Sequence, residues 1–344
     1  MKDNRKPIGV FIKDTHLSQK SLKINQSIFK QAIDLCKKLK TPLFHAGDVF
    51  TARASQPLEM LNAFRDILSN LEDNNIYMHI IAGNHDKVNQ EDERSYISAF
   101  EKHPNIKLYS KQETVDFGDI VIHFMPYFLE NGSYSERLET LKPIKDKYNI
   151  CLTHISVNGV KNNDGSEVEN GIGKKAFDKF DLTMIAHYHD ESWIGKKIWY
   201  YPGTYQANFG ETTKKGFIIL YNDNTFEFIQ SVFPQFIKVK LNITDQKAIK
   251  QAEKELKNSP HNVRFVFEGE EAELKNVDKE KYSALGIDVI FNKDSATPLN
   301  NEGLVERASS ISFDRSNVQS AFETFCQTKH IEDNSIGLEY LKKI

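Results

Sequence analysis

Polar residues able to bind a cation or move a proton follow five apolar segments of this chain. The clearest group is Gly83-Asn84-His85-Asp86, which stands where the apolar run 76–82 stops abruptly at a glycine, as a buried strand does when it ends in a loop. Taken alone, these four residues could equally form an ordinary turn. In chain order the five groups are Asp14 with His16, Asp48, Asn84 with His85, His154, and His187 with His189. Because strand ends of one sheet converge on one edge, we expect these groups to share a site.

The chemical types of these side chains indicate a divalent metal site. All are imidazole, carboxylate or amide groups, and there is no thiolate among them. Such ligands suit hard to borderline ions such as Mn²⁺ and do not suit a structural zinc knuckle. These side chains are more ligands than a single ion can coordinate. Two ions would each take four if one carboxylate bridged them, and Asp48 is the natural bridge.

The segments that position these residues alternate between strand and helix. Strands are expected at 8–12, 43–46 and 76–82, and helices at about 24–39 and from Pro57 to about 71. This β-α-β-α-β series predicts an α/β layered domain. Further strands are expected at 106–109, 114–117, 120–125, 149–153 and 182–186, with an antiparallel finish at 198–201, 217–221 and 226–232.

A smaller α+β unit is expected to follow. Its predicted elements are strands at 236–243, 263–268 and 287–291, and helical segments at about 246–257 and 270–284. We therefore divide the chain into a main domain at 1–235, a small domain at 236–292, a linker rich in Asn and Ser at 293–315, and a helical tail at 316–344.

Composition narrows the classes of function. The 344 residues carry a net charge of −3, so no global electrostatic attraction draws the chain to nucleic acid. Cys36, Cys151 and Cys326 lie far apart in apolar contexts, which favours reduced, buried thiols in a cytosolic compartment. Only five apolar residues, at 8–12, follow the charged start, and no later run reaches eighteen. We therefore expect a soluble, cytoplasmic protein without a signal peptide or membrane span.

Five short motifs together resemble one known family. They match, in order, the signature blocks of the calcineurin-like metallophosphoesterase superfamily: Asp14-x-His16, Gly47-Asp48, Gly83-Asn84-His85-Asp86, His154 and His187-x-His189. Within it, the chain is similar to the SbcD-type nuclease subunit of complexes that repair DNA double-strand breaks, including the phage recombination endonuclease subunit. This narrower resemblance rests on Tyr201-Pro202-Gly203-Thr204 with Lys215-Gly216-Phe217, on the small domain and on the tail.

The resemblance implies a fold and a set of residue roles. The fold would be a metallophosphoesterase β-sandwich flanked by helices, with 236–292 as a DNA-binding cap and 316–344 as a helical tail for an ATPase partner. His85 would face the phosphate and act as an acid or as a transition-state stabiliser. Asp86 would orient His85 or a metal ligand, and Asp190 would do the same beside His189, without binding a metal themselves. One metal would be held by Asp14, His16, Asp48 and His189, and the other by Asp48, Asn84, His154 and His187.

Three positions depart from the family pattern. Lys13 stands where a small residue usually precedes the first Asp, Thr51 replaces a second Asp often found after Gly-Asp, and Ala186 replaces a Gly before His-x-His. None of these changes removes a direct ligand. Nearby, Arg53 either contacts a DNA phosphate or forms a surface salt bridge, and His45, inside an apolar strand, is expected to be a core residue.

The leading hypothesis is a two-metal, Mn²⁺-dependent DNA nuclease that hydrolyses phosphodiesters with a metal-activated hydroxide. The resemblance implies double-strand exonuclease and single-strand endonuclease activity, a homodimer, and an SbcC-like coiled-coil ATPase partner in the cytoplasm (that of the host, if the chain is phage-encoded). Mg²⁺, Fe²⁺ and Zn²⁺ remain alternatives to Mn²⁺. The rival functions are a phosphatase or cyclic-nucleotide phosphodiesterase of the same superfamily, and a DNA-repair scaffold without catalysis. The apolar stripe at 318–326 either binds the ATPase or packs on its own small domain.

Overall fold

The computed structural model describes residues 5–161 and 166–293. The predicted helical tail at 316–344, and all of the predicted linker except residue 293, lie outside these residues. The chain divides into two compact units, and the larger one contains both of the six-stranded sheets described below. The domain boundaries drawn from the sequence remain predictions.

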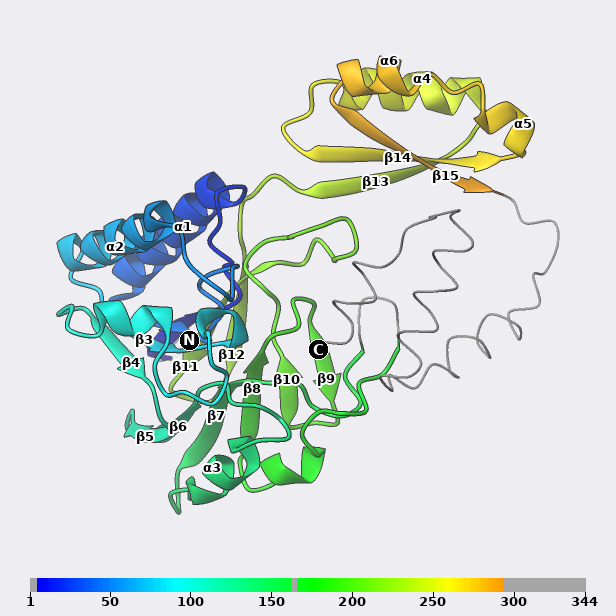
Figure 1. Ribbon diagram of the computed structural model, residues 1–344. Helices are drawn as coiled ribbons and strands as arrows, with labels where there is room; N and C mark the ends of the chain where they lie inside the picture. Colours follow the sequence, from blue (N-terminus) through cyan, green and yellow to red (C-terminus); the bar gives the residue numbers. More distant parts are fainter. Residues whose placement is uncertain (1–4, 162–165, 294–344) are drawn as a thin grey trace, which may run out of the picture. The chain divides into compact units, whose positions relative to one another are not determined.

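The first sheet has the strand order β12-β11-β1-β2-β3-β4 (Figure 1). Its four parallel strands are β1 (Pro7–Ile12), β2 (Leu43–His45), β3 (Met78–Ile81) and β4 (Ile106–Tyr109). Two later strands complete it: β11 (Gly216–Tyr221) pairs antiparallel with β1, and β12 (Phe226–Gln230) pairs antiparallel with β11. The strands of the second sheet therefore lie, in the sequence, between β4 and β11 of the first sheet.

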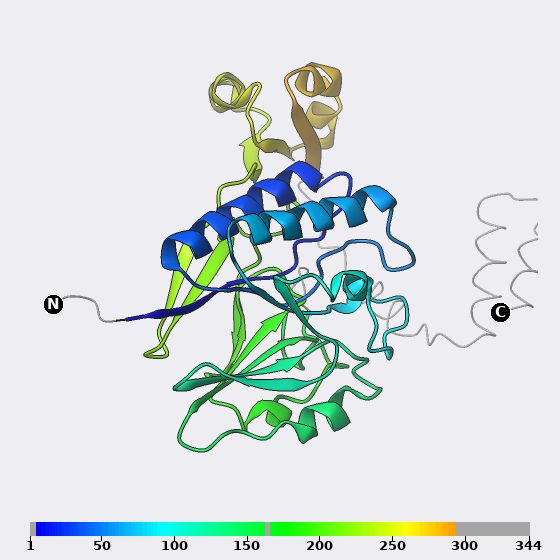
Figure 2. The ribbon, with the colours of Figure 1, turned by 90° about the vertical axis from the view of Figure 1, so that its left-hand side faces the viewer.

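Helices α1 (Leu22–Leu39) and α2 (Leu58–Asp73) lie side by side over the first sheet (Figure 2). The buried face of α1 repeats every four residues at Ile28, Ala32 and Cys36, which is the spacing of one side of an α-helix. These side chains pack with the outward face of the sheet in one apolar cluster. Both helices thus connect strands whose carboxyl ends lie along one edge of the sheet.

The second sheet has the strand order β5-β6-β7-β8-β10-β9. Strands β6 (Ile120–Met125), β7 (Tyr148–His154), β8 (Leu182–Ala186) and β10 (Ile198–Tyr200) run parallel. The edge strands β5 (Glu113–Asp116) and β9 (Ser192–Ile194) are antiparallel to their neighbours. The sequence prediction placed β10 in an antiparallel finish, and this was wrong, because β10 pairs in parallel with β8.

The two sheets face one another across an apolar core that includes Phe11, Phe44, Phe124 and Leu152. A further cluster covers the outer face of the second sheet and includes residues of α3 (Tyr134–Thr140) and of the short 3₁₀ segment Lys174–Phe177. The predicted fold class, α/β with layered sheets flanked by helices, is confirmed. Neither α3 nor β9 was predicted; both are short, and three-residue strands show almost no periodicity.

A three-stranded sheet follows, in the order β13-β14-β15. Its strands are β13 (Phe236–Asn242), β14 (Asn262–Gly269) and β15 (Ile287–Lys293), and the helices of this region are α4 (Gln246–Leu256), α5 (Glu271–Leu274) and α6 (Lys279–Ala284). The helical segment expected at 270–284 is thus two short helices. Among the described residues, no helix has the length and apolar character needed to cross a membrane.

Candidate active site

The predicted site residues lie at strand ends of both sheets, and this corrects the expectation of a single sheet edge. Asp14 and Asp48 follow β1 and β2 in the first sheet, whereas His154 ends β7 and His187 follows β8 in the second. The two sheets are joined here directly, because Nδ1 of His154 donates a hydrogen bond to the carbonyl oxygen of Ala46 at 2.9 Å. The site is therefore built across the mouth of the sandwich.

Several candidate ligands have an unusual backbone conformation. Asp14, His16, Asp48 and His187 have φ angles of 49°, 45°, 56° and 92°. Non-glycine residues seldom adopt positive φ, and such strain persists only where the surrounding structure enforces it. Of the nine non-glycine residues with positive φ in the described ranges, these four belong to the candidate site. The backbone conformation of these loops therefore directs the four side chains into the candidate site.

Two glycines allow the loops to approach closely. A Cβ on Gly83 would lie 2.2 Å from Oδ1 of Asp48 and 2.7 Å from Cε1 of His154, and a Cβ on Gly47 would lie 2.5 Å from the nitrogen of Gly83. No real Cβ tolerates such distances, so these positions require glycine. The Gly47 turn is held from behind by His45, whose Nδ1 accepts a hydrogen bond from the Gly47 N–H at 3.1 Å. His45 is fully buried, as expected of a core residue.

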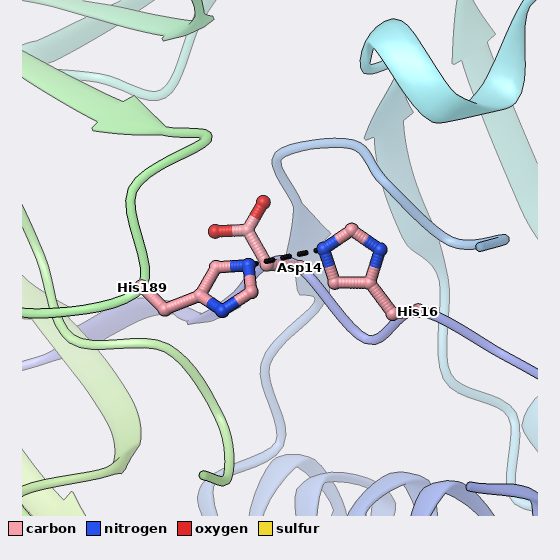
Figure 3. A group of neighbouring side chains, drawn as sticks. All are labelled: Asp14, His16 and His189. Carbon is pink, nitrogen blue, oxygen red and sulfur yellow. Dashed lines mark hydrogen bonds between the residues drawn. The ribbon is translucent and has the colours of Figure 1, made fainter. Parts of the chain in front are cut away.

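One cluster of side chains contains Asp14, His16 and His189, which point toward one another in Figure 3. The Nε2 atoms of the two imidazoles are 3.0 Å apart. Nδ1 of His189 donates to Oε1 of Glu211 at 2.8 Å, so the lone pair of His189 is on the nitrogen that faces His16. The three residues are arranged so that a metal ion could be held between them.

A second cluster contains Asp48, His154 and His187, with the side chain of Asn84 between the imidazoles. Nε2 of His154 lies 3.0 Å from Oδ1 of Asn84 and 3.4 Å from Oδ2 of Asp48, and Nδ1 of His187 lies 3.2 Å from the same Asn84 oxygen. Because Nδ1–H of His154 donates to the Ala46 carbonyl, the neutral ring, the form that binds a metal, has its lone pair on Nε2. With the Asn84 oxygen turned inward, lone pairs converge; the reverse amide orientation would instead donate to both imidazoles. The inward oxygen is the orientation that suits a cation.

Asp48 lies between the two clusters. Its Oδ2 is 3.7 Å from Nε2 of His16 on one side and 3.4 Å from Nε2 of His154 on the other. Its Oδ1 accepts a hydrogen bond from the His85 N–H at 2.8 Å. Burial raises the pKa of Asp48, but the charge of His154 and its hydrogen bond outweigh burial and hold that pKa below its usual value. A single ionised carboxylate therefore faces both sets of ligands.

His85 is partly exposed and has both ring nitrogens occupied by neighbours outside the two clusters. Its Nδ1 lies 2.5 Å from the carbonyl oxygen of Thr51, and its Nε2 lies 3.1 Å from Nη2 of Arg53. His16, Asp48 and His85 also lie close enough together to be a third possible group of metal ligands. The partners of His85 favour a different role, because Nδ1 is committed to Thr51 and Nε2 accepts from Arg53. Arg53 contacts His85 and forms no ion pair within the described residues, so the predicted surface salt bridge was wrong, whereas the predicted DNA contact stays a prediction.

Lys13, a departure from the family pattern, is fully buried beside Asp14. Its Nζ donates to the carbonyl oxygens of Tyr188 at 2.6 Å and Ile185 at 3.3 Å, and it lies 3.5 Å from Oδ2 of Asp14. Burial raises the pKa of Asp14, but the charges of Lys13 and His154 bring that pKa down to about 2. Lys13 thus balances the charge of Asp14 and ties the β1 and β8 ends together.

The two predicted supporting carboxylates hold backbone and neighbouring side chains. Asp86 accepts from the N–H groups of Gly83 at 2.9 Å and Phe50 at 3.0 Å, and burial, reinforced by the charge of Asp48, raises its pKa to about 7. Asp190 accepts from Thr212 and from Nζ of Lys215 at 2.8 Å. Neither bonds to the ring of His85 or His189; both hold the neighbouring loops, and their supporting role stays a prediction.

Glu211 was missed from the sequence. It bonds to the His189 ring as described, and its Oε2 lies 3.0 Å from Nζ of Lys215. Burial raises the pKa of Glu211, but the hydrogen bond from His189 and the nearby positive charges bring it down to about 2. Glu211 lies 22 positions after its partner in a loop, and no periodicity links the two; only its closeness to the Lys215-Gly216-Phe217 motif could have drawn attention to it.

The clusters open into a cavity of about 540 Å³. Its walls include His16, Asp48, His85, His187 and His189, so candidate ligands from both clusters face the same space. All seven predicted ligands and His85 have therefore been brought together by the fold. A phosphate in this space would meet imidazoles, a carboxylate and the face of His85.

Comparison with known proteins gives matches for this region. A family model described as "Calcineurin-like phosphoesterase" matches residues 11–191. "Exonuclease subunit 1" of Enterobacteria phage T4 is 29% identical over 163 residues, which are 46% of this chain and 47% of that protein, so the chain spans about half the length of this curated relative. One solved structure covers 66% of this chain and 100% of its own, with 9% identity and a TM-score of 0.41. That last likeness is too distant to bear on function.

Proposed function

The chain belongs to the calcineurin-like phosphoesterase family, and from this premise we propose that it is a two-metal DNA nuclease. The phosphoesterase class follows from the family. The choice of DNA is supported by the similarity to a protein named as an exonuclease subunit. The observation that carries the proposal is the convergence of two ligand clusters on Asp48, with the ring of His85 beside them and hydrogen-bonded to Thr51 and Arg53 instead.

In the proposed arrangement each ion has four ligands and Asp48 is shared. Asp14, His16, Asp48 and His189 hold one, and Asp48, Asn84, His154 and His187 hold the other. The residues fit divalent cations, because the hydrogen bonds of His154 to Ala46 and of His189 to Glu211 leave their Nε2 lone pairs facing inward. Nitrogen and oxygen donors without thiolate suit Mn²⁺, with Mg²⁺, Fe²⁺ and Zn²⁺ as alternatives.

When bound, a pair of divalent ions generates a nucleophile from water at neutral pH and neutralises charge on a phosphodiester. The chain's own residues orient the substrate and manage the proton on the leaving oxygen. Thr51 fixes the Nδ1 proton of His85, which leaves Nε2 and the Arg53 guanidinium directed at a phosphate in the cavity. In this role Nε2 would also carry a proton, so that the imidazolium of His85 stabilises the developing charge or protonates the departing oxygen in place of accepting from Arg53.

The remaining parts of the proposal concern partners and location. The word "subunit" in the relative's name supports assembly with a second protein. We propose an SbcC-like coiled-coil ATPase that contacts residues 316–344, a DNA-binding role for residues 236–292, a homodimer, and a place in DNA repair and recombination. The phage source of the relative supports the cytoplasm of a host cell as the location.

The first test is the substrate. We expect the purified chain with Mn²⁺ to hydrolyse linear duplex DNA from its ends and single-stranded circles internally, and EDTA to abolish both reactions. Parallel assays with p-nitrophenyl phosphate and a cyclic nucleotide address the rival enzymes. Hydrolysis of those small esters without DNA cleavage would favour a phosphatase or cyclic-nucleotide phosphodiesterase. A chain that binds DNA and cleaves nothing would be a scaffold.

A second prediction concerns Glu211. We expect Glu211→Gln to weaken Mn²⁺ binding by about 10- to 100-fold, because the neutral amide no longer fixes the His189 tautomer or balances Lys215. Isothermal titration calorimetry measures the affinity directly, independently of catalysis. The control is Glu191→Gln, since Glu191 bonds to Trp199 and Lys214 outside the clusters. Unchanged Mn²⁺ affinity in Glu211→Gln would show that this carboxylate does not position His189.

A further inference from the structure

A smaller cavity of about 270 Å³ lies next to the cavity at the candidate site, along the start of α1. Ile24 lines both, and we call the two neighbouring cavities together the α1 groove. Its walls beyond the ligands are made by Ser18, Lys20, Lys23, Ile24, Tyr205 and Phe233. The α1 groove begins at the proposed cleavage point and leads away from it.

The first wall of the α1 groove is positively charged without compensation. From Thr15 to Phe29 the chain has two lysines, Lys20 and Lys23, and no carboxylate. Lys20 and Lys23 are exposed and make no ion pair within residues 5–161 and 166–293. Lys23 stands in the first turn of α1, where no acidic residue occurs and where the helix dipole disfavours a positive charge. The fold gains nothing from this placement, whereas a polyanion lying in the groove would.

Hydroxyl groups tie this charged segment to the candidate site. Ser21 precedes α1 but does not cap it; its Oγ donates instead to the carbonyl oxygen of His16 at 2.8 Å. The backbone N–H of Ser18 in turn donates to that same Oγ at 3.1 Å. The loop that carries Lys20 and the start of α1 that carries Lys23 are thereby fixed relative to His16, a proposed metal ligand.

The opposite wall is apolar. Tyr205 presents its ring to the cavity while its hydroxyl donates to the carbonyl oxygen of Thr15 at 2.9 Å, which fixes the ring against the β1 loop. Phe233 and Val232 line the far end, and the Val232 side chain is 76% exposed. Apolar and aromatic walls beside a basic stripe are what unpaired bases and their phosphates require together.

We propose that the α1 groove binds a single strand of nucleic acid next to the phosphate that is cleaved. Lys20 and Lys23 contact its phosphates, and Ile24 and Val232 contact its unpaired bases over the buried rings of Tyr205 and Phe233. A duplex would satisfy the lysines but would offer no free base faces to the apolar wall. This inference rests on the proposed nuclease function, because the groove acquires its direction from the site where cleavage would occur.

The test measures binding separately from cleavage. The full chain carrying His85→Ala, loaded with Mn²⁺, is titrated into a fluorescein-labelled single-stranded oligonucleotide, and anisotropy is followed at several salt concentrations. We expect the added pair Lys20→Gln and Lys23→Gln to raise the Kd about tenfold or more near 0.1 M salt. The slope of log K against log salt should flatten by about 1.4, since each lost phosphate contact on a single strand removes about 0.7.

The matched control removes two exposed lysines outside the groove, Lys38→Gln with Lys102→Gln. An equal loss of affinity in this control, or an unchanged salt slope in the groove variant, overturns the proposal. Because Lys23→Gln removes a charge that opposes the helix dipole, thermal unfolding should show no loss of stability. The nuclease proposal is tested separately. It is wrong if the wild-type chain cleaves no DNA, whatever the binding data show.

The apolar wall has its own test. A strand of equal length that lacks bases keeps every phosphate, and we expect the Mn²⁺-loaded His85→Ala chain to bind it at least tenfold more weakly than a normal strand. Equal affinity for both strands would show that the groove does not contact the bases. An equal effect of the lysine pair on a blunt duplex and on a single strand would overturn the single-strand assignment.

Discussion

Replacement of His85 by alanine is expected to lower kcat for DNA hydrolysis by about 10²- to 10⁴-fold while two Mn²⁺ ions still bind. The proposed metal ligands are untouched in this variant, because the ring of His85 bonds to Thr51 and Arg53 rather than to either cluster. The backbone N–H of residue 85 remains, so its hydrogen bond to Oδ1 of Asp48 is retained. The lost function is that of the imidazole on the phosphate.

The leaving group separates the two roles open to His85. DNA releases an alkoxide that needs a proton, whereas bis(p-nitrophenyl) phosphate releases a stable phenolate that does not. A much larger loss on DNA than on the aryl ester would identify a general acid; equal losses would identify electrostatic stabilisation of the transition state. His103→Ala, which removes a partly exposed imidazole near Glu72, is the control. If kcat of His85→Ala stayed within threefold of the wild type, His85 would take no part in the mechanism.

Local pattern was enough to predict most elements of this fold. The helix stripe at Ile28, Ala32 and Cys36 and the buried runs of β6 and β8 are periodic over several residues, so the predicted bounds of β6 and β8 equal the observed ones. The candidate ligands were found for a related reason. A polar residue that ends an apolar run is conspicuous, and five such endings occur in the family's order.

Pairing between distant segments could not be predicted in the same way. Whether β10 lies parallel to β8, and whether the ends of β3 and β7 meet, depends on which sheet each strand joins. Lys13 shows the same limit: as a departure from the family pattern it had no assigned role, yet its Nζ reaches the β8 end 172 residues away. Such contacts depend on the packing of two sheets, which leaves no local trace in the sequence.

Replacement of Asp48 by asparagine is expected to abolish the binding of both metal ions and to lower kcat/KM for DNA by about 10³-fold or more. The side-chain oxygen of the variant should stay in the place of Oδ1, because the His85 N–H donates to that atom. The amide NH₂ then replaces Oδ2 and points donors at Nε2 of His154 and His16. Those donors would hydrogen-bond to the nitrogen lone pairs that the cations require. Bound ions stabilise the transition state by several kcal/mol, so losing them lowers kcat/KM by several powers of ten.

Metal stoichiometry distinguishes a bridging carboxylate from an ordinary ligand. After equilibrium dialysis against Mn²⁺, we expect Asp48→Asn to retain almost no metal and Asp14→Asn to retain one ion per chain, because Asp14 belongs to one cluster alone. Asp34→Asn removes an exposed carboxylate that pairs with Lys30 on α1, and it should retain both ions. If Asp48→Asn kept one ion as Asp14→Asn does, Asp48 would serve a single metal. The two clusters would then be separate sites, and a shared carboxylate could no longer account for their meeting at the mouth of the sandwich.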